Sequence, residues 1–231
     1  TRPFSAGLHC RVKTDYDSGT YQCGSSHIHA ATRRQMPGIT GKQQEGQNIK
    51  RILITGANKG IGLATAQAAL EHSPDVHVLL GCREQTRGQR ALDTLATKQP
   101  AWESRLELLE VDVASDDSVA LARDAVVRRY GTETPPLYGV VNNAGIGLGS
   151  ADIAAVVSVN TLGVRRICET FVALLEPSGR IVNVSSASGP KFVSQCSAGK
   201  QRFFQNADIS WAELADLIED VMELDINAAD F

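Results

Sequence analysis

The stretch TGANKGIG at 55–62 constrains the fold more than any other part of the sequence. It follows the apolar run Ile52-Leu53-Ile54 and opens an alanine-rich segment of helical character. Where a strand turns directly into a helix, glycines permit a tight turn and bring backbone N–H groups against a pyrophosphate. A tight turn that holds no ligand is the alternative interpretation. The candidate phosphate-binding residues of this loop are Gly56, Asn58, Lys59, Gly60, Ile61 and Gly62.

From Arg51 onward, short apolar runs alternate with longer segments of helical periodicity. The alternation is typical of a parallel sheet covered by helices on both faces. We therefore expect a Rossmann-type, doubly wound α/β fold. The expected strands are 51–55, 76–81, 105–111, 137–141 and 180–184, and the expected helices are 61–71, 85–95, 115–130, 151–175 and 210–224. The last helix begins with a capping box, Ser210-Trp211-Ala212-Glu213.

The composition excludes several classes of protein. A net charge of −3 and a pI of about 6.0 give no chain-wide attraction to nucleic acid. No apolar run approaches the roughly 20 residues of a membrane span. The five cysteines are odd in number and lack C-x-x-C spacing, so no disulfide framework and no metal site is expected. These features favour one globular domain in the reducing cytoplasm.

Residues 1–49 form a separate region that is rich in Gly, Ser, Thr, Gln and Arg and lacks sustained periodicity. We expect a disordered tail or leader here, followed by the Rossmann domain at 50–231. The arginines and hydroxyl residues would suit an organellar transit peptide, but Asp15, Asp17 and Glu45 argue against that alternative.

Two further motifs follow expected strands. Asn142-Asn143-Ala144-Gly145 comes after Val140-Val141, and Arg180-Ile181-Val182-Asn183-Val184 runs into Ser185-Ser186. With TGANKGIG before them, these stretches resemble the short-chain dehydrogenase/reductase family over residues 51–225. The stretch CREQTRG at 82–88 and the helix at Trp211 are similar to the monomeric NADPH-dependent carbonyl reductases within that family.

The expected cofactor is NADP(H). NAD binders usually carry an acid at the end of the second strand, whereas an arginine there suits the 2′-phosphate of NADP. The sequence has Arg83 at this place, Arg87 one turn later and Lys59 in the glycine loop. Two charge-assisted hydrogen bonds of about 1.5–3 kcal/mol each would raise the affinity for NADP over that for NAD by roughly two to four powers of ten, before opposing free-energy costs are subtracted. The resemblance also implies that Asp112 and Val113 flank the adenine and that Asn143 lies along the ribose.

The resemblance implies hydride transfer from nicotinamide to a small-molecule carbonyl substrate. A family tyrosine supplies the proton, a lysine four residues later lowers the pKa of the tyrosine, a serine orients the carbonyl and an asparagine supports a water-linked proton path. Ser186 matches the serine better than Ser185 does. Asn160, in Val-Asn-Thr-Leu-Gly, matches the asparagine.

The family tyrosine is missing, since Tyr16, Tyr21, Tyr130 and Tyr138 all precede Ser186. Cys196-Ser-Ala-Gly-Lys200 offers a thiol in its place, but the segment is more similar to an insert that precedes the tyrosine in carbonyl reductases. We therefore expect that the sequence stops before Tyr-x-x-x-Lys and that the chain is inactive or weak.

A truncated sheet would be incomplete on its C-terminal side. The strand at 180–184 would then be an open apolar edge through which an otherwise monomeric chain aggregates or dimerises. A non-catalytic NADP-binding or regulatory module and an inactive gene fragment are the alternative functions. No membrane partner is expected.

Overall fold

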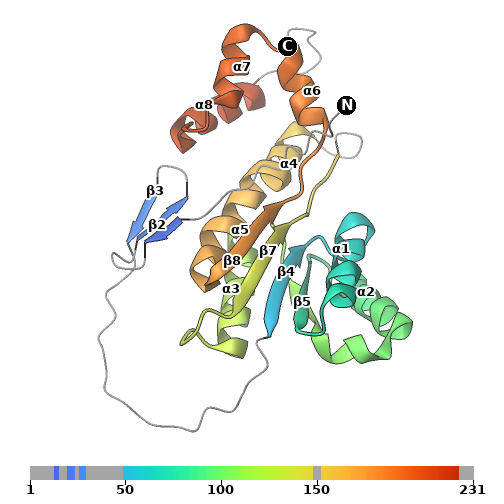
Figure 1. The fold of residues 1–231 in the computed structure, drawn as a ribbon. Coiled ribbons are helices and arrows are strands. Elements are labelled where there is room, and N and C mark those ends of the chain that lie inside the picture. The colour runs from blue at the N-terminus through green and yellow to red at the C-terminus, as the bar shows by residue number, and fades with distance from the viewer. Residues whose placement is uncertain (1–12, 16–19, 24–25, 30–48, 148–151, 224–231) are drawn as a thin grey trace, which may run out of the picture. The chain divides into compact units, whose positions relative to one another are not determined.

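The structure divides into two compact units. It is a computed structural model that describes residues 13–15, 20–23, 26–29, 49–147 and 152–223. The described part of the first unit is 49–147 and 152–183. The described part of the second unit is 184–223 together with the short strands before residue 30 (Figure 1).

A parallel sheet of five strands, in the order β6-β5-β4-β7-β8, forms the centre of the first unit. The strands are β4 (Lys50–Thr55), β5 (Val76–Cys82), β6 (Leu106–Glu110), β7 (Leu137–Asn142) and β8 (Leu175–Asn183). The chain moves outward from β4 through β5 to β6 and then returns to the other side of β4. The strand order therefore reverses between β4 and β7, and ligands of open α/β sheets bind at the carboxyl ends of strands beside such a reversal.

Helices connect these strands and cover both faces of the sheet (Figure 1). They are α1 (Gly60–His72), α2 (Gln85–Lys98), the 3-10 helix Pro100–Arg105, α3 (Asp116–Tyr130), α4 (Ile153–Val157), the π helix Ser158–Leu162, α5 (Gly163–Phe171) and the 3-10 helix Val172–Leu174. The single helix expected at 151–175 is thus a continuous series of α, π and 3-10 segments. Its expected first residue lies outside the described residues.

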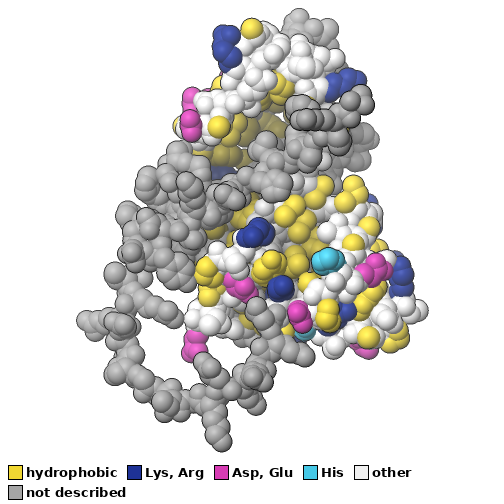
Figure 2. All heavy atoms as spheres, in the orientation of Figure 1, with side chains coloured by type: hydrophobic (Ala, Val, Ile, Leu, Met, Phe, Trp, Pro, Cys, Tyr) yellow, Lys and Arg dark blue, Asp and Glu magenta, His cyan; other side chains and the backbone are white. Residues whose placement is uncertain are grey.

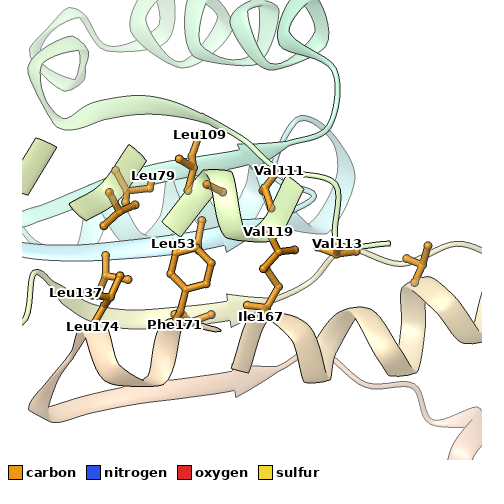
Figure 3. Packing of buried hydrophobic residues seen from close by; sticks show 14 residues of the cluster. Leu53, Leu79, Leu109, Val111, Val113, Val119, Leu137, Ile167, Phe171 and Leu174 are labelled. Atoms are coloured by element: carbon orange, nitrogen blue, oxygen red, sulfur yellow. The ribbon is translucent and has the colours of Figure 1, made fainter. Parts of the chain in front are cut away.

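The alternation of side chains along β4 explains the two layers of helices. Leu53 and Ile54 are both fully buried, and consecutive side chains of a strand point to opposite faces. Leu53 belongs to the hydrophobic cluster that includes Ile167 and Phe171 of α5 (Figure 3). Ile54 belongs to the other cluster, which contains Leu70 of α1. The prediction of a doubly wound α/β fold is confirmed.

Strand β8 begins five residues before the expected start at 180. Leu175 pairs with Leu137, but the next paired residue, Arg180, lies opposite Gly139, so residues 176–179 form a bulge that contains Pro177. Proline has no N–H to donate to a ladder, which explains the irregularity. Among the described strands β8 pairs only with β7, and Val182 on this edge is 49% exposed.

The second unit consists mainly of α6 (Ser188–Gln195), α7 (Ala198–Gln205) and α8 (Trp211–Glu223). Only α8 was expected, and its capping box is confirmed: the Glu213 N–H donates to Ser210 Oγ at 3.2 Å and the Ser210 N–H donates to Glu213 Oε2 at 2.8 Å. Phe204 packs edge to face on Phe192 and Phe203, with ring centroids 6.0 and 5.5 Å apart. None of residues 184–222 is buried, and hydrophobic side chains lie at the surface of both units in Figure 2.

Three short strands, β1 (Lys13–Asp15), β2 (Thr20–Cys23) and β3 (Ser26–His29), pair in an antiparallel sheet. Residues 1–49 were expected to have no regular structure, and these strands differ from that expectation. The rest of 1–48 lies outside the described residues. Within the described ranges, no helix has the length and apolar character needed to cross a membrane.

Candidate cofactor site

The glycine loop between β4 and α1 adopts backbone conformations that require glycine. Gly56 and Gly60 have φ values of +63° and +55°, in the left-handed region. At Gly62 a Cβ atom would come within 2.4 Å of Asn143 Nδ2 and 2.6 Å of the Gly56 carbonyl oxygen. At Gly60, by contrast, a Cβ would meet nothing within 4 Å. The loop is therefore closed on its inner side at Gly62 and open at Gly60, as a phosphate cradle at the N-terminus of a helix requires.

Thr55 and Asn143 tie this loop to the Asn-Asn-Ala-Gly motif after β7. Thr55 is 1% exposed, and its Oγ1 accepts hydrogen bonds from the Asn143 and Ala144 N–H groups, each at 3.0 Å. Asn143 Nδ2 in turn donates to the Thr55 carbonyl at 2.9 Å and to the Gly56 carbonyl at 3.2 Å. The two motifs, which lie far apart in the sequence, thus form one rigid corner at the reversal of strand order.

A cleft of about 370 Å³ opens at the carboxyl ends of the strands beside this corner. Its lining includes every residue that the sequence analysis assigned to the cofactor: Gly56, Asn58, Lys59, Gly60, Ile61, Gly62, Arg83, Arg87, Asp112, Val113 and Asn143. The lining also includes residues that were not predicted: Cys82, Glu84, Val111, Ala144, Gly145, Ile146 and Val159. The volume lies within the range of ligand sites, and the open glycine backbone and the basic side chains fit a dinucleotide.

The charges of the cleft gather where β5 leads into α2. Arg83 is exposed and forms no ion pair with the described residues. Arg87 lies in the first turn of α2, and its Nε is 2.8 Å from Glu84 Oε2. Two arginines and one carboxylate therefore lie together at the end of the second strand, which is the place where dinucleotide-binding folds contact the adenine ribose.

Asp112 and Val113, which are expected to flank the adenine, are held by hydrogen bonds and close packing. Asp112 Oδ1 accepts from the Ala114 N–H at 3.0 Å, and the Asp112 N–H donates to Ser118 Oγ at 2.9 Å. Val113 is buried, and a Cβ added at Gly163 would lie 2.9 Å from Val113 Cγ2. The glycine at the start of α5 thus allows this helix to approach the cleft wall closely.

Asn160 lies in the π helix Ser158–Leu162 and reaches back to the Asn-Asn-Ala-Gly segment. Its Oδ1 accepts from the Ile146 N–H and its Nδ2 donates to the Ile146 carbonyl, both at 2.9 Å. Both polar atoms of the side chain are therefore engaged, so Asn160 acts here as a fixed brace for the cleft wall. Single π turns are often found at functional sites, because they interrupt the regular hydrogen bonds of the helix.

Ser186 belongs to the second unit, whose C-terminal segment begins at Val184. Its Oγ accepts from the Ser188 N–H at 3.1 Å, and its own hydrogen has no acceptor among the described residues. Cys196 lies at the end of α6, where its thiol donates to the Phe192 carbonyl at 3.4 Å, and Lys200 lies on α7. The structure thus divides the sequence-predicted residues between the units, with the cofactor residues and Asn160 in the first and Ser186 in the second.

A family model described as short chain dehydrogenase matches residues 50–202, well over half of the sequence. The chain belongs to the short-chain dehydrogenase family. The match includes the glycine loop, the Asn-Asn-Ala-Gly motif and β8, which are the stretches from which the resemblance was inferred.

Similar proteins in the short-chain dehydrogenase family include carbonyl reductases. The NADPH carbonyl reductase 1 of Homo sapiens is 35% identical over 183 residues, which cover 76% of this chain and 62% of that protein. The NADPH carbonyl reductase 1 of Mus musculus is 34% identical over 179 residues, covering 74% and 61%. This member of the family therefore spans about three fifths of the length of these relatives.

Solved structures support the fold. The menthone neomenthol reductase of Mentha piperita superposes with a TM-score of 0.64 at 22% identity, covering 78% of this chain and 75% of that one. The salutaridine reductase of Papaver somniferum gives a TM-score of 0.63 at 20% identity, covering 75% and 69%. At these identities the likeness establishes the Rossmann-type fold of this family member and nothing about its substrate.

Proposed function

We propose that the cleft binds NADP(H) and that the protein works as a carbonyl reductase on a small-molecule carbonyl compound. The observation that carries the proposal is the cleft itself, in which the open glycine loop lies beside Lys59, Arg83 and Arg87. The similar carbonyl reductases, whose names include NADPH, support it. When bound, the cofactor would supply the hydride that the carbonyl carbon accepts.

Each group of cleft residues has a separate task in this proposal. The N–H groups of the glycine loop hold the pyrophosphate, and the α1 dipole favours its negative charge. Arg83, Arg87 and Lys59 bind the 2′-phosphate through charge-assisted hydrogen bonds. Asn160 and Thr55 keep the wall of the cleft in place through the hydrogen bonds described above, so that little reorganisation is needed when the cofactor enters.

In the proposed proton step, Ser186 orients the substrate carbonyl and a tyrosine donates the proton. Ser186 accepts a hydrogen bond from a backbone N–H, so its own hydrogen is available to orient a substrate carbonyl. No tyrosine follows Ser186 in the sequence. General acid catalysis typically contributes 10²–10⁴-fold, so the chain as given is proposed to be inactive or weak, with Cys196 as the only substitute donor that the sequence analysis suggested.

We further propose a cytoplasmic location and a monomeric chain whose β8 edge is prone to pairing. The five cysteines of the sequence are scattered and lack C-x-x-C spacing, which suits a reducing compartment. Val182 of the edge strand β8 is 49% exposed, and among the described strands β8 pairs only with β7, so a further strand could form hydrogen bonds along its other side.

Titration of the chain with NADPH and NADH, followed by the fluorescence of the nicotinamide, tests the binding part of the proposal. We expect saturable binding of both and tighter binding of NADPH, and Arg83→Ala should remove most of the difference. Equal affinities for the two cofactors would overturn the assignment of the 2′-phosphate site.

Assays of quinone and aldehyde reduction test the catalytic part. The unmodified chain is compared with a version extended through Tyr-x-x-x-Lys, and the extended version is expected to turn over about 10²–10⁴-fold faster. Tight NADPH binding without turnover by either version would favour a non-catalytic NADP-binding module. Comparable turnover by both, lost in the short chain on Cys196→Ser, would show that the thiol donates the proton.

A further inference from the structure

Glu84 places a negative charge in the part of the cleft that the two arginines make positive. It is the residue before α2, and Arg87 lies three residues later in the first turn. The 2.8 Å separation of Arg87 Nε and Glu84 Oε2 makes them an ion pair. Arg87, one of the side chains assigned to the 2′-phosphate, therefore already has an anionic partner within the protein.

The Glu84 carboxylate is not used to cap α2, and the Glu84 backbone is held by two hydrogen bonds. A residue in this position commonly caps its helix, but Glu84 makes no side-chain hydrogen bond to the first turn of α2. Its backbone carbonyl accepts from the Gly88 N–H at 2.9 Å and from the Cys82 thiol at 3.3 Å, which fixes the backbone. The first turn of α2 contains no acid, so Glu84 is the carboxylate that competes for Arg87 in this turn.

The pair is easy to separate. The side chains of Arg87 and Glu84 are 55% and 42% exposed. An exposed ion pair changes an equilibrium by about fivefold at most, whereas a phosphate offers Arg87 stronger, charge-assisted hydrogen bonds. Arg87 can thus exchange one anion for the other, but the exchange lowers the affinity for the phosphate by the strength of the lost pair.

We propose that Glu84 reduces the preference of the cleft for the phosphorylated cofactor by competing with the 2′-phosphate for Arg87. The same carboxylate, close to the end of the second strand, is able to accept a hydrogen bond from an unphosphorylated 2′-hydroxyl. Glu84 therefore weakens binding of the phosphorylated cofactor and strengthens binding of the other. This inference rests on the proposed function, since it assumes that the cleft holds the adenine ribose there.

The test uses Glu84→Gln and two fragments that isolate this end of the cofactor, adenosine 2′,5′-bisphosphate and adenosine 5′-monophosphate. Calorimetric titration should show about two- to fivefold tighter binding of the bisphosphate and weaker binding of the monophosphate. Unchanged or weaker binding of the bisphosphate would overturn the proposal. The matched control is Glu169→Gln, which removes the same charge from an exposed arginine pair on α5, outside the cleft, and should change neither affinity.

A second background tests the role of Arg87. In Arg87→Ala, the further change Glu84→Gln should no longer tighten bisphosphate binding, because there is no arginine left to release. An equal gain in both backgrounds would show that Glu84 repels the phosphate directly and would overturn the competition. If the unmodified chain binds no bisphosphate at all, the proposed function fails; if it binds and Glu84→Gln has no effect, only this inference fails.

Discussion

The two units of the chain contain helices of similar length but differ in what holds these helices in place. Helices α1 in the first unit and α8 in the second each have 13 residues. Gly62, Ala66 and Leu70 of α1 are buried, whereas no residue of 184–222 is buried. Most helical stability in proteins comes from packing of an apolar face. The first unit therefore has a core that specifies its structure, and the second depends on local contacts.

Local contacts in the second unit include caps at helix ends. Ser210 and Glu213 form the capping box of α8, and Ser197 Oγ accepts from the Lys200 N–H at the start of α7. Each cap contributes only about 0.5–2 kcal/mol. The comparison shows that the cofactor cleft, which lies wholly in the first unit, has a rigid support that Ser186 in the second unit lacks.

The largest expected difference between the units is in the cost of removing an aromatic ring. Phe171→Ala removes a fully buried ring from the first unit and should lower the free energy of unfolding by about 3–5 kcal/mol. Phe204, in the second unit, is 38% exposed, so Phe204→Ala should cost less than about 1 kcal/mol. Urea unfolding followed by circular dichroism measures both. Similar losses for the two variants would break the comparison.

A substitution in the glycine loop of the first unit should lower the affinity for NADPH, whereas a substitution in the second unit should not. In Gly62→Ala the new Cβ would lie 2.4 Å from Asn143 Nδ2, so the corner must distort and NADPH affinity should fall at least about tenfold, a change of roughly 1.4 kcal/mol. The control is Gly139→Ala on β7, where the nearest atom to the new Cβ is at an ordinary 3.5 Å. Fluorescence titration should show affinities near that of the unmodified chain for Gly139→Ala and for Phe204→Ala. A loss of affinity with Phe204→Ala would mean that the second unit supports the cleft.

Much of the first unit could be predicted from the sequence, because its information is local. Short apolar runs between segments of helical periodicity indicated the strands, and glycine spacing after the first of them indicated the loop. The early start of β8 could not be predicted, because Pro177 interrupts the pattern and Leu175 regains its pairing only through contact with Leu137. Helices α6 and α7 were missed because each has only eight residues, about two turns, which is too short for a helical period to be recognised in the sequence.

Several hydrogen bonds that support the cleft were not predicted, because they join distant parts of the chain. In the sequence, Thr55 is an ordinary β-branched residue of a strand. Its hydrogen bonds to the Asn143 and Ala144 N–H groups span more than 80 positions of the chain. The pairing of Asn160 with Ile146 likewise depends on the tertiary fold. The Glu84 and Arg87 pair is different, since a spacing of three at a helix start was visible in the sequence and indicates a contact.

Arg166 offers a sharper test of how the first unit holds its cleft wall. Its Nε pairs with Asp116 Oδ1 at 2.7 Å, and its NH1 donates to the carbonyls of Ser158 at 3.1 Å and Val113 at 3.4 Å. Arg166→Ala should lower the free energy of unfolding by about 1–2 kcal/mol, because it leaves these partners unsatisfied. Arg123→Ala, which removes an exposed pair with Asp124 on α3, should cost under about 0.5 kcal/mol. Equal losses in the free energy of unfolding for the two variants, measured by urea unfolding, would contradict the proposal that Arg166 links Asp116, Ser158 and Val113.

High pH should weaken the first unit through Tyr130. Burial, followed by the hydrogen bond and the charge of Glu107, raises the pKa of Tyr130 to about 12 from an ordinary 10.0, although Arg129 and Arg51 oppose the rise. The folded state keeps this proton between pH 10 and 12 while the unfolded state loses it, so the contribution to stability is complete below pH 10 and is lost toward pH 12. The free energy of unfolding of Tyr130→Phe should thus fall less steeply than that of the unmodified chain. Because the side chain is partly exposed, the difference should stay below about 1.4 kcal/mol per pH unit.

Low pH should act on the second unit through the cap of α8, with the smallest effect. Hydrogen bonds from the Ser210 side chain and backbone lower the pKa of Glu213 below the ordinary 4.5. A carboxyl whose folded-state pKa is lowered contributes its stability above the ordinary value and loses it as the pH falls through the lowered one. Since the side chain is fully exposed, protonation should fray only the first turn of α8 and leave the first unit unchanged. Side-chain NMR of Glu213 during an acid titration measures its pKa, and Ser210→Ala should raise that pKa toward the ordinary value. An unchanged pKa in Ser210→Ala would mean that the cap does not hold the carboxylate, and the second unit would then have even less local support than the comparison assigns to it.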